Sequence, residues 1–200
     1  ITADFCSRLG IATRILPMTD DCVRTRVRTA EGWLDFQDYF VRQQCAPEVA
    51  AVAFEGAPQA APLPEFIAAL RDPALRAVVI CPSNPLISIA PILAVPGVRE
   101  ALAECAAPVV AVSPIIGGRA VKGPTARMMA ALGLEVTAAV VARHYGDLLD
   151  GYVLDAEDAA QAAVIDIPSI ATQTLMRTLA DREALARAVL GFTDTIAAAG

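Results

Sequence analysis

Two segments of the sequence place small, hydroxyl-bearing and cationic residues directly after apolar runs. The first is Pro82-Ser83-Asn84-Pro85, which follows the apolar residues 77–81. The second covers residues 113–124, which follow the apolar residues 108–112 and include Gly117, Gly118, Arg119, Lys122 and Gly123. Small residues let a backbone approach a ligand closely, and backbone N–H groups and hydroxyls can then hold phosphate oxygens. Both segments are therefore candidates for binding an anionic ligand, with side-chain donors on Ser83, Asn84 and Ser88 and two cations, Arg119 and Lys122.

Each segment also has a purely structural interpretation. Ser-Asn-Pro is a common way to turn a chain and cap the next helix. The Gly-Gly-Arg segment could be only a mobile connection. It is not a P-loop, because Lys122 is not followed by Ser or Thr. Local spacing leaves both alternatives open.

Three further groups could take part in chemistry. Asp20 and Asp21 follow an apolar run, and paired carboxylates suit metal binding or general-base catalysis, although a solvated turn explains them as well. His144 is a candidate catalytic base, but a histidine near a helix C-terminus is also stabilised by the helix dipole. Arginines 24, 26 and 28 alternate along one strand face, which is more typical of a solvated surface than of a phosphate track.

The hydrophobic pattern predicts the elements that would position these residues. Strict alternation over residues 23–29 and 33–37 predicts a β-hairpin, and the start of the chain is expected to be helical up to Gly10. Further strands are expected at residues 12–18, 49–54, 76–81, 108–112, 152–154 and 164–167. Helices are expected at residues 64–71, 98–105, 125–132 and 137–145, in a short turn within 86–94, and in a final helix capped by Asp181.

Strands and helices alternate from residue 49 onward, which is typical of an α/β fold with a parallel sheet. We therefore expect a Rossmann-like, mostly parallel sheet with helices on both faces and an inserted β-hairpin at about residues 12–45. Ligands of such sheets bind outside the carboxyl ends of the strands, where both candidate loops begin.

Composition narrows the class of protein. The 200 residues are 56% hydrophobic with a formal net charge of −6, which argues against a nucleic-acid-binding surface. No apolar run is long enough to span a membrane, and the five widely spaced cysteines predict reduced thiols in a cytoplasmic protein. The first residues contain no Met, so we expect the chain to be the later part of a longer protein.

Five stretches together resemble the 2-phospho-L-lactate transferase (CofD-like) family. They are LPMTDD (16–21), DFQDYFV (35–41), CPSNPLISIAPILAVPGVREAL (81–102), PVVAVSPIIGGRAVKGP (108–124) and VARHYGDLLDGYVLD (141–155). The resemblance covers essentially the whole chain, in the same order and spacing.

The resemblance implies a transferase of coenzyme F(420) biosynthesis. The family moves a phospholactyl or phosphoenolpyruvyl group from a guanosine diphosphate ester to the ribityl hydroxyl of a deazaflavin, and GMP is released. It requires Mg²⁺, and members similar to this chain are generally homodimers. Ser83-Asn84-Pro85 matches the family signature at the nucleotide end of the pocket.

The chain departs from the family pattern at its start. Family members open with a glycine-rich nucleotide loop and an Asn-x-Gly-Asp-Asp segment whose carboxylates serve the metal. We expect residues 1–200 to be the C-terminal two-thirds of a single CofD-like domain, with those metal carboxylates upstream of Ile1. No residue of the chain is therefore assigned to metal, and the isolated chain is expected to be inactive.

One alternative function shares the same fold. A sister family binds nucleotide sugars without catalysis and acts as a regulator, and it would also use a Ser-Asn-Pro-like loop. LPMTDD and the His-Tyr-Gly-Asp stretch favour the transferase over this regulator.

Overall fold

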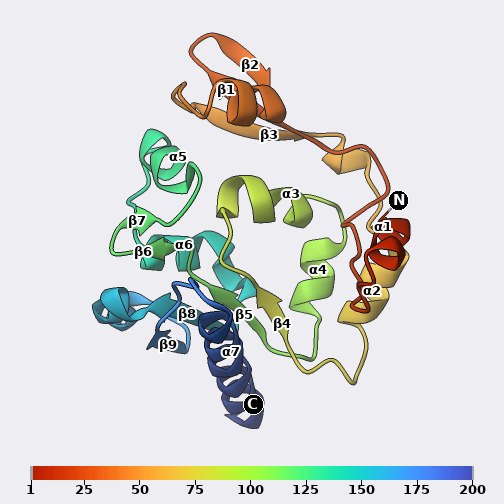
Figure 1. Ribbon diagram of the computed structural model, residues 1–200, viewed down its shortest axis with the longest axis vertical. Coiled ribbons are helices and arrows are strands. Elements are labelled where there is room, and N and C mark those ends of the chain that lie inside the picture. The colour runs from red at the N-terminus through yellow and green to blue at the C-terminus, as the bar shows by residue number, and fades with distance from the viewer. Residues whose placement is uncertain (1, 200) are drawn as a thin grey trace.

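A four-stranded parallel sheet and a three-stranded antiparallel sheet organise the chain, for which a computed structural model describes residues 2–199 (Figure 1). The parallel sheet has the strand order β4-β5-β8-β9 and the antiparallel sheet the order β2-β1-β3. The strands are β1 (Arg24–Thr29), β2 (Gly32–Asp35), β3 (Ala51–Glu55), β4 (Val78–Ile80), β5 (Val109–Val112), β6 (Ile115–Ile116), β7 (Arg119–Ala120), β8 (Gly151–Asp155) and β9 (Ser169–Thr172).

Helices connect and cover the strands. The α-helices are α1 (Thr2–Arg8), α2 (Pro64–Leu70), α3 (Ala90–Leu93), α4 (Val98–Ala103), α5 (Thr125–Ala131), α6 (Ala138–Tyr145) and α7 (Leu179–Ala199). Short helices of other types are η1 (Asp38–Arg42), η2 (Ala57–Gln59), η3 (Pro85–Ile89), η4 (Gly146–Leu148) and η5 (Ala156–Val164). The expected Rossmann-like α/β class is confirmed.

Both faces of the parallel sheet are buried, which explains why its central strands are almost continuously apolar. On one face, Val110, Val112 and Val153 pack against Leu185, Val189 and Phe192 of α7. On the other face, the alternate strand residues join the main core with α4 and α6. Helices therefore cover both faces, as the sequence predicted.

The antiparallel sheet lies at one end of the molecule and α7 with the C-terminus at the other (Figure 1). The predicted hairpin is confirmed, with Val27 opposite Leu34 and Arg28 opposite Trp33. Val27 is fully buried and belongs to the same core cluster as Met128 and Met129. The two sheets thus share one core.

Three sequence predictions about strands are wrong. Residues 12–18 form no strand, because they do not pair with the backbone of any other strand. The strand predicted at residues 49–54 exists as β3, but it pairs antiparallel with β1 and does not join the parallel sheet. The strand predicted at 164–167 lies instead at Ser169–Thr172, because Ile165 and Ile167 pack against the core from a connecting segment.

The final helix begins before the predicted cap. Asp181 is the third residue of α7, and its carboxylate accepts hydrogen bonds from the backbone N–H groups of Arg177 and Thr178. The hydroxyl of Thr178 in turn accepts a hydrogen bond from the N–H of Asp181. Thr178 and Asp181 therefore form a reciprocal capping box.

Candidate functional site

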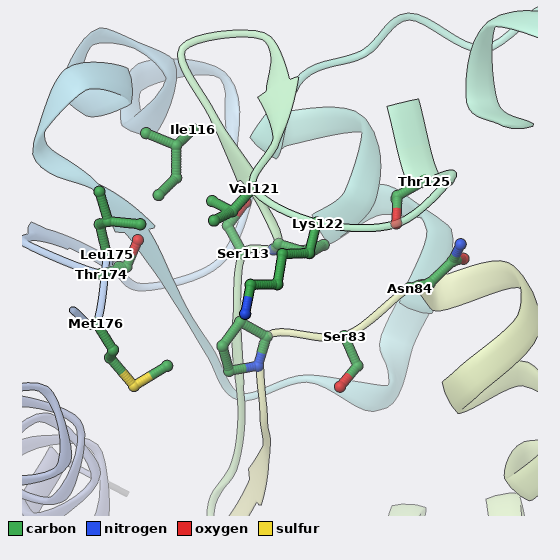
Figure 2. Close-up of a pocket in the computed structure, with 12 residues that line it drawn as sticks. Ser83, Asn84, Ser113, Ile116, Val121, Lys122, Thr125, Thr174, Leu175 and Met176 are labelled. Carbon is green, nitrogen blue, oxygen red and sulfur yellow. The ribbon is translucent and has the colours of Figure 1, made fainter. Parts of the chain in front are cut away.

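The carboxyl ends of the parallel strands surround a pocket of about 260 Å³ (Figure 2). The segments that follow β4, β5 and β9 each contribute lining residues, so residues distant in sequence meet at one edge of the sheet. The lining residues are Pro82, Ser83, Asn84, Ser113, Pro114, Ile116, Val121, Lys122, Thr125, Thr174, Leu175 and Met176. The volume is just below the range of about 300–1,000 Å³ usual for small-molecule sites.

Asn84 acts as the cap of the helical segment that follows β4. Its Oδ1 accepts hydrogen bonds from the N–H groups of Leu86 at 2.8 Å and Ile87 at 3.3 Å. Its Nδ2 donates to the sulfur of Met128, 3.6 Å away, and only 9% of the residue is exposed. Asn84 thus shapes the pocket wall mainly by holding the start of η3.

The helical turn predicted within 86–94 is confirmed, as η3 and α3. Pro85 is buried at the first position of η3, where a proline costs no hydrogen bond. Ser88 is exposed and does not line the pocket. Of the four candidate residues on this segment, only Ser83 and Asn84 reach the pocket, and Ser83 is half-buried there.

The second candidate loop begins as the small hairpin β6–β7. Gly117 turns it with a φ of +54°, and the Gly117 N–H donates to Oδ2 of Asp158 at 2.9 Å. Gly117, Gly118 and Arg119 are exposed and lie outside the pocket lining, whereas Ile116 faces it. The structure therefore separates Arg119 from Lys122, although the two are close in sequence.

Lys122 supplies the positive charge of the pocket. It is the one cationic residue among those that line the described cavity. Figure 2 shows its side chain extending between Ser83 on one side and Thr174, Leu175 and Met176 on the other. An ammonium group in this position favours an anionic group of a ligand.

The opposite wall is fixed by Asp155, which sequence reasoning did not single out. Asp155 ends β8 and is 5% exposed. Its Oδ2 accepts hydrogen bonds from the N–H and the hydroxyl of Thr174, at 2.8 and 2.9 Å. Burial alone would raise the pKa of Asp155, but hydrogen bonds from Glu157 and Thr174 outweigh burial and lower this pKa.

Asp158 is a second buried carboxylate that the sequence interpretation missed. It binds Gly117 and also accepts a hydrogen bond from Gln161 Nε2 at 2.8 Å. Asp155 thus fixes a pocket wall through Thr174, whereas Asp158 holds the β6–β7 turn at Gly117, outside the pocket lining. A signal existed in the sequence, because Asp155 directly follows the apolar residues 152–154 of a predicted strand, at the edge where ligands bind.

Asp20 and His144 are not brought to the pocket. Asp20 is exposed, and its neighbour Asp21 accepts a hydrogen bond from the N–H of Ala61 at 2.8 Å, which ties this turn to the segment before α2. His144 is at the end of α6, which leads to the amino end of β8, at the edge of the sheet opposite the pocket. Burial and the nearby Arg99 lower the pKa of His144.

The arginine stripe is a surface feature of the antiparallel sheet. Arg26 lies within ion-pair distance of Asp35 at 3.4 Å and Glu55 at 3.3 Å, and Arg28 lies over the ring of Trp33. These contacts support the solvated-face interpretation. No two of the five cysteines are joined by a disulfide in the part of the chain that the structure describes.

The described residues do not form a metal-binding cluster. Within residues 2–199, no three His, Cys, Asp or Glu side chains are grouped so that they could hold a metal ion. The carboxylate oxygens of Asp155 and Asp158 are already bonded to internal donors. Lys122 and the hydroxyls of Ser83 and Thr125 suit the pocket to an anionic ligand. No helix within residues 2–199 has the length and apolar character to cross a membrane.

Comparisons with known proteins identify similar chains. The model of the family "2-phospho-L-lactate transferase CofD" matches residues 1–189. A phosphoenolpyruvate transferase of Kitasatospora aureofaciens is 39% identical over 98% of this chain and 63% of the relative. A 2-phospho-L-lactate transferase of Methanosarcina mazei is 42% identical over 80% of this chain and 51% of the relative.

A solved structure supports the fold alone. Protein BH3568 of Bacillus halodurans, described as a member of the UPF0052 family, has a TM-score of 0.64 and 15% identity. The match covers 94% of this chain and 65% of that protein. This chain spans about three fifths of the length of the first curated relatives that it matches, at 59–63%.

Proposed function

Because the chain belongs to the 2-phospho-L-lactate transferase CofD family, we propose that it forms part of a transferase of coenzyme F(420) biosynthesis. The enzyme would move a phospholactyl or phosphoenolpyruvyl group from a guanosine diphosphate ester to the ribityl hydroxyl of a deazaflavin and release GMP. The observation that carries this proposal is the pocket at the carboxyl edge of the parallel sheet, with Lys122 extending into it. Relatives carry both transferase names, so both donors remain within the proposal.

The proposed chemistry needs positioning and charge neutralisation more than covalent help from the protein. The hydroxyl oxygen of the acceptor attacks the phosphorus that carries the lactyl or enolpyruvyl group. The bond from this phosphorus to the oxygen of GMP breaks, GMP keeps that electron pair, and the hydroxyl proton is released. Lys122 would balance negative charge on the diphosphate, and the hydroxyls of Ser83 and Thr125 would donate to its oxygens.

Magnesium is part of the proposal only through the family. Mg²⁺ favours oxygen ligands and would neutralise phosphate charge in such a reaction. The residues described here do not fit a resident metal site, since they contain no acidic cluster and the buried carboxylates of Asp155 and Asp158 accept hydrogen bonds from internal donors. No step is assigned to the metal. We further propose a cytoplasmic homodimer, in line with the family.

A matched pair of substitutions tests the proposal in the full-length protein. Lys122→Gln removes the cation that lines the pocket, and Arg119→Gln removes an exposed cation outside it. Lys122→Gln should weaken GDP binding about tenfold or more, because one hydrogen bond between charged groups, of about 1.5–3 kcal/mol, is lost. Arg119→Gln should leave the dissociation constant within about twofold.

The measurements are calorimetry with GDP and an assay of GMP release from the guanosine diphosphate ester in the presence of the deazaflavin. GDP binding with no GMP release would contradict the transferase, and equal GDP affinity in both variants would contradict the role of Lys122. Stabilisation by UDP-sugars with no quenching of deazaflavin fluorescence would favour the nucleotide-sugar regulator instead.

A further inference from the structure

The hydroxyl of Thr174 lies in the pocket wall with its proton already engaged. Thr174 is 4% exposed and lines the pocket. Its Oγ1 donates to Oδ2 of Asp155 at 2.9 Å, and its N–H donates to the same oxygen at 2.8 Å. The two bonds fix both the backbone and the side chain of Thr174.

The direction of this hydrogen bond follows from the chemistry of the partner. An ionised carboxylate has only acceptors, so the hydroxyl proton must point toward Asp155. The other carboxylate oxygen of Asp155 accepts from the N–H of Glu157 at 3.0 Å. No ion pair found among residues 2–199 includes Asp155, so backbone and hydroxyl donors alone satisfy its charge. The Thr174 oxygen therefore keeps only lone pairs for a ligand.

The two sides of the pocket differ in hydrogen-bonding character. Lys122, Ser83 and Thr125 carry protons that suit phosphate oxygens. Thr174 lies across the pocket from Ser83, beside Leu175 and Met176 (Figure 2). A phosphate oxygen carries no proton at neutral pH that Thr174 could accept, so this wall suits a different part of the ligand.

We propose that Thr174 accepts a hydrogen bond from a hydroxyl of the bound ligand, and that Asp155 is a positioning residue that orients the Thr174 hydroxyl for this role. The inference rests on the proposed function, which supplies two hydroxyl-bearing molecules, the ribose of the guanosine nucleotide and the polyol chain of the deazaflavin. In both molecules the group that would donate to Thr174 is an alcohol, held close to the anionic diphosphate.

The test compares four variants of the full-length protein: Thr174→Val, Thr174→Ser, Asp155→Asn and the double variant Asp155→Asn/Thr174→Val. Binding of GDP and of the deazaflavin is measured separately by calorimetry and by fluorescence quenching. Thr174→Val keeps the shape but removes the acceptor, and should weaken one of the two ligands about three- to tenfold. Thr174→Ser keeps the hydroxyl and should stay within about twofold of the wild type.

Asp155→Asn tests whether Asp155 orients the Thr174 hydroxyl or only stabilises the pocket wall. The asparagine amide can donate, which frees the Thr174 proton to turn toward the ligand, so Asp155→Asn should weaken the same ligand. In the Thr174→Val background, the Asp155→Asn substitution should cause no further loss of affinity, because no hydroxyl remains to be oriented. Melting temperatures of all variants are measured in parallel.

Ligand analogues keep the test independent of any folding defect. The wild type is titrated with 2′-deoxyGDP, 3′-deoxyGDP and a deazaflavin without the polyol chain. The analogue that lacks the relevant hydroxyl should bind the wild type about three- to tenfold more weakly than its parent ligand does. Thr174→Val should bind this analogue and its parent ligand with equal affinity. This result identifies the ribose or the polyol as the source.

Three results would overturn the inference. The first is that Thr174→Val binds GDP and the deazaflavin as tightly as the wild type does. The second is that Thr174→Ser loses as much affinity as Thr174→Val. The third is that the wild type binds every analogue as tightly as the parent ligand. Failure of the proposed function is distinct, since the wild type itself would then bind neither GDP nor deazaflavin.

Discussion

Ser83 and Asn84 are adjacent but contribute differently to the pocket. Ser83 is half-buried at the pocket surface, whereas the carbonyl oxygen of the Asn84 side chain is used by two backbone N–H groups of η3. An amide that caps a buried helix start influences a ligand through the position of its neighbours. The capping interpretation and the binding interpretation of this loop are therefore compatible, because the cap holds the residue that faces the ligand.

Asn84→Ala should lower the free energy of unfolding by about 1 kcal/mol, the usual cost of a lost N-cap. GDP binding should weaken as well, because Ser83 loses its fixed position. Asn84→Asp is the matched control for stability only, since its carboxylate keeps the capping oxygen and suits a helix N-terminus but adds a negative charge to the pocket lining. Chemical denaturation and calorimetry measure the two effects. An Asn84→Ala variant as stable as the wild type would contradict the capping role.

Asp155 makes stability depend on pH in a defined direction. Hydrogen bonds lower the pKa of this carboxyl in the folded protein below its ordinary value near 4. The unfolded chain therefore takes up a proton first as the pH falls. The contribution of Asp155 is complete above the ordinary pKa and is lost as the pH falls through the folded pKa.

Asp155→Asn should accordingly destabilise the protein most near neutral pH, by about 1–3 kcal/mol. The difference from the wild type should shrink as the pH falls below the ordinary pKa near 4 and through the lower pKa of the folded protein, where the wild type loses this contribution. Denaturant unfolding at a series of pH values measures this difference in the free energy of unfolding. Asp20→Asn is the control, because Asp20 is exposed and lies outside the pocket. A difference that stays constant over this range would argue against an ionised Asp155.

At the scale of elements, α7 depends on a glycine in β8. A Cβ on Gly151 would lie 2.5 Å from Cδ1 of Ile196 and 2.8 Å from Cε1 of Phe192. Both side chains belong to α7, and Phe192 is buried against the sheet. Gly151 therefore permits the close approach of α7 to the sheet.

Gly151→Ala should destabilise the protein by about 1–3 kcal/mol, because an added methyl in this packed interface forces the side chains of Phe192 and Ile196 to move. Gly191→Ala is the control on the same helix, since no atom lies within 4 Å of the position of its Cβ. That change should stabilise by about 0.5–1 kcal/mol, as alanine favours a helix interior. Thermal unfolding of both variants measures the contrast. Equal shifts in the same direction would show that α7 does not need this close contact.

Most elements of the parallel sheet could be predicted from the sequence, because strands covered on both faces require continuous apolar residues. Residues 108–112 illustrate this, since β5 is buried along its whole length. It was harder to predict which strands pair with one another. The β3 residues Ala51–Glu55 read as one more apolar strand, and only their cross-strand contacts with β1 place them in the antiparallel sheet. The edge strand β9 is half-exposed, so its residues carry a weaker apolar signal than Ile165 and Ile167 before it.

The same limit applies to the candidate site. Hydroxyls and cations after strands could be found from spacing, and Ser83, Asn84 and Lys122 do line one pocket. Spacing could not separate Lys122 from Arg119, because the β6–β7 hairpin sets which side chain faces the cavity. Asp155 and Asp158 were missed since their role depends on partners 19 and 41 residues away.

For the whole molecule, the charges of the described pocket are unbalanced for a diphosphate ester. Lys122 is the cationic residue among the lining residues, while a diphosphate carries at least two negative charges. Within residues 2–199 there is also no cluster of acidic side chains that could bring in a divalent cation. A transferase of this family would need further positive charge at this pocket to stabilise the transition state.

We therefore predict that residues 1–200 alone bind GDP weakly and release no GMP from the guanosine diphosphate ester and deazaflavin. A full-length protein containing this chain should catalyse the reaction in the presence of Mg²⁺. GMP release, measured chromatographically for both proteins at equal concentration, gives the comparison. Circular dichroism and thermal unfolding of the 200-residue chain serve as the control that it is folded. Turnover by the folded chain alone would mean that Lys122 and the surrounding hydroxyls suffice for the chemistry, and would contradict the need for further charge at the pocket.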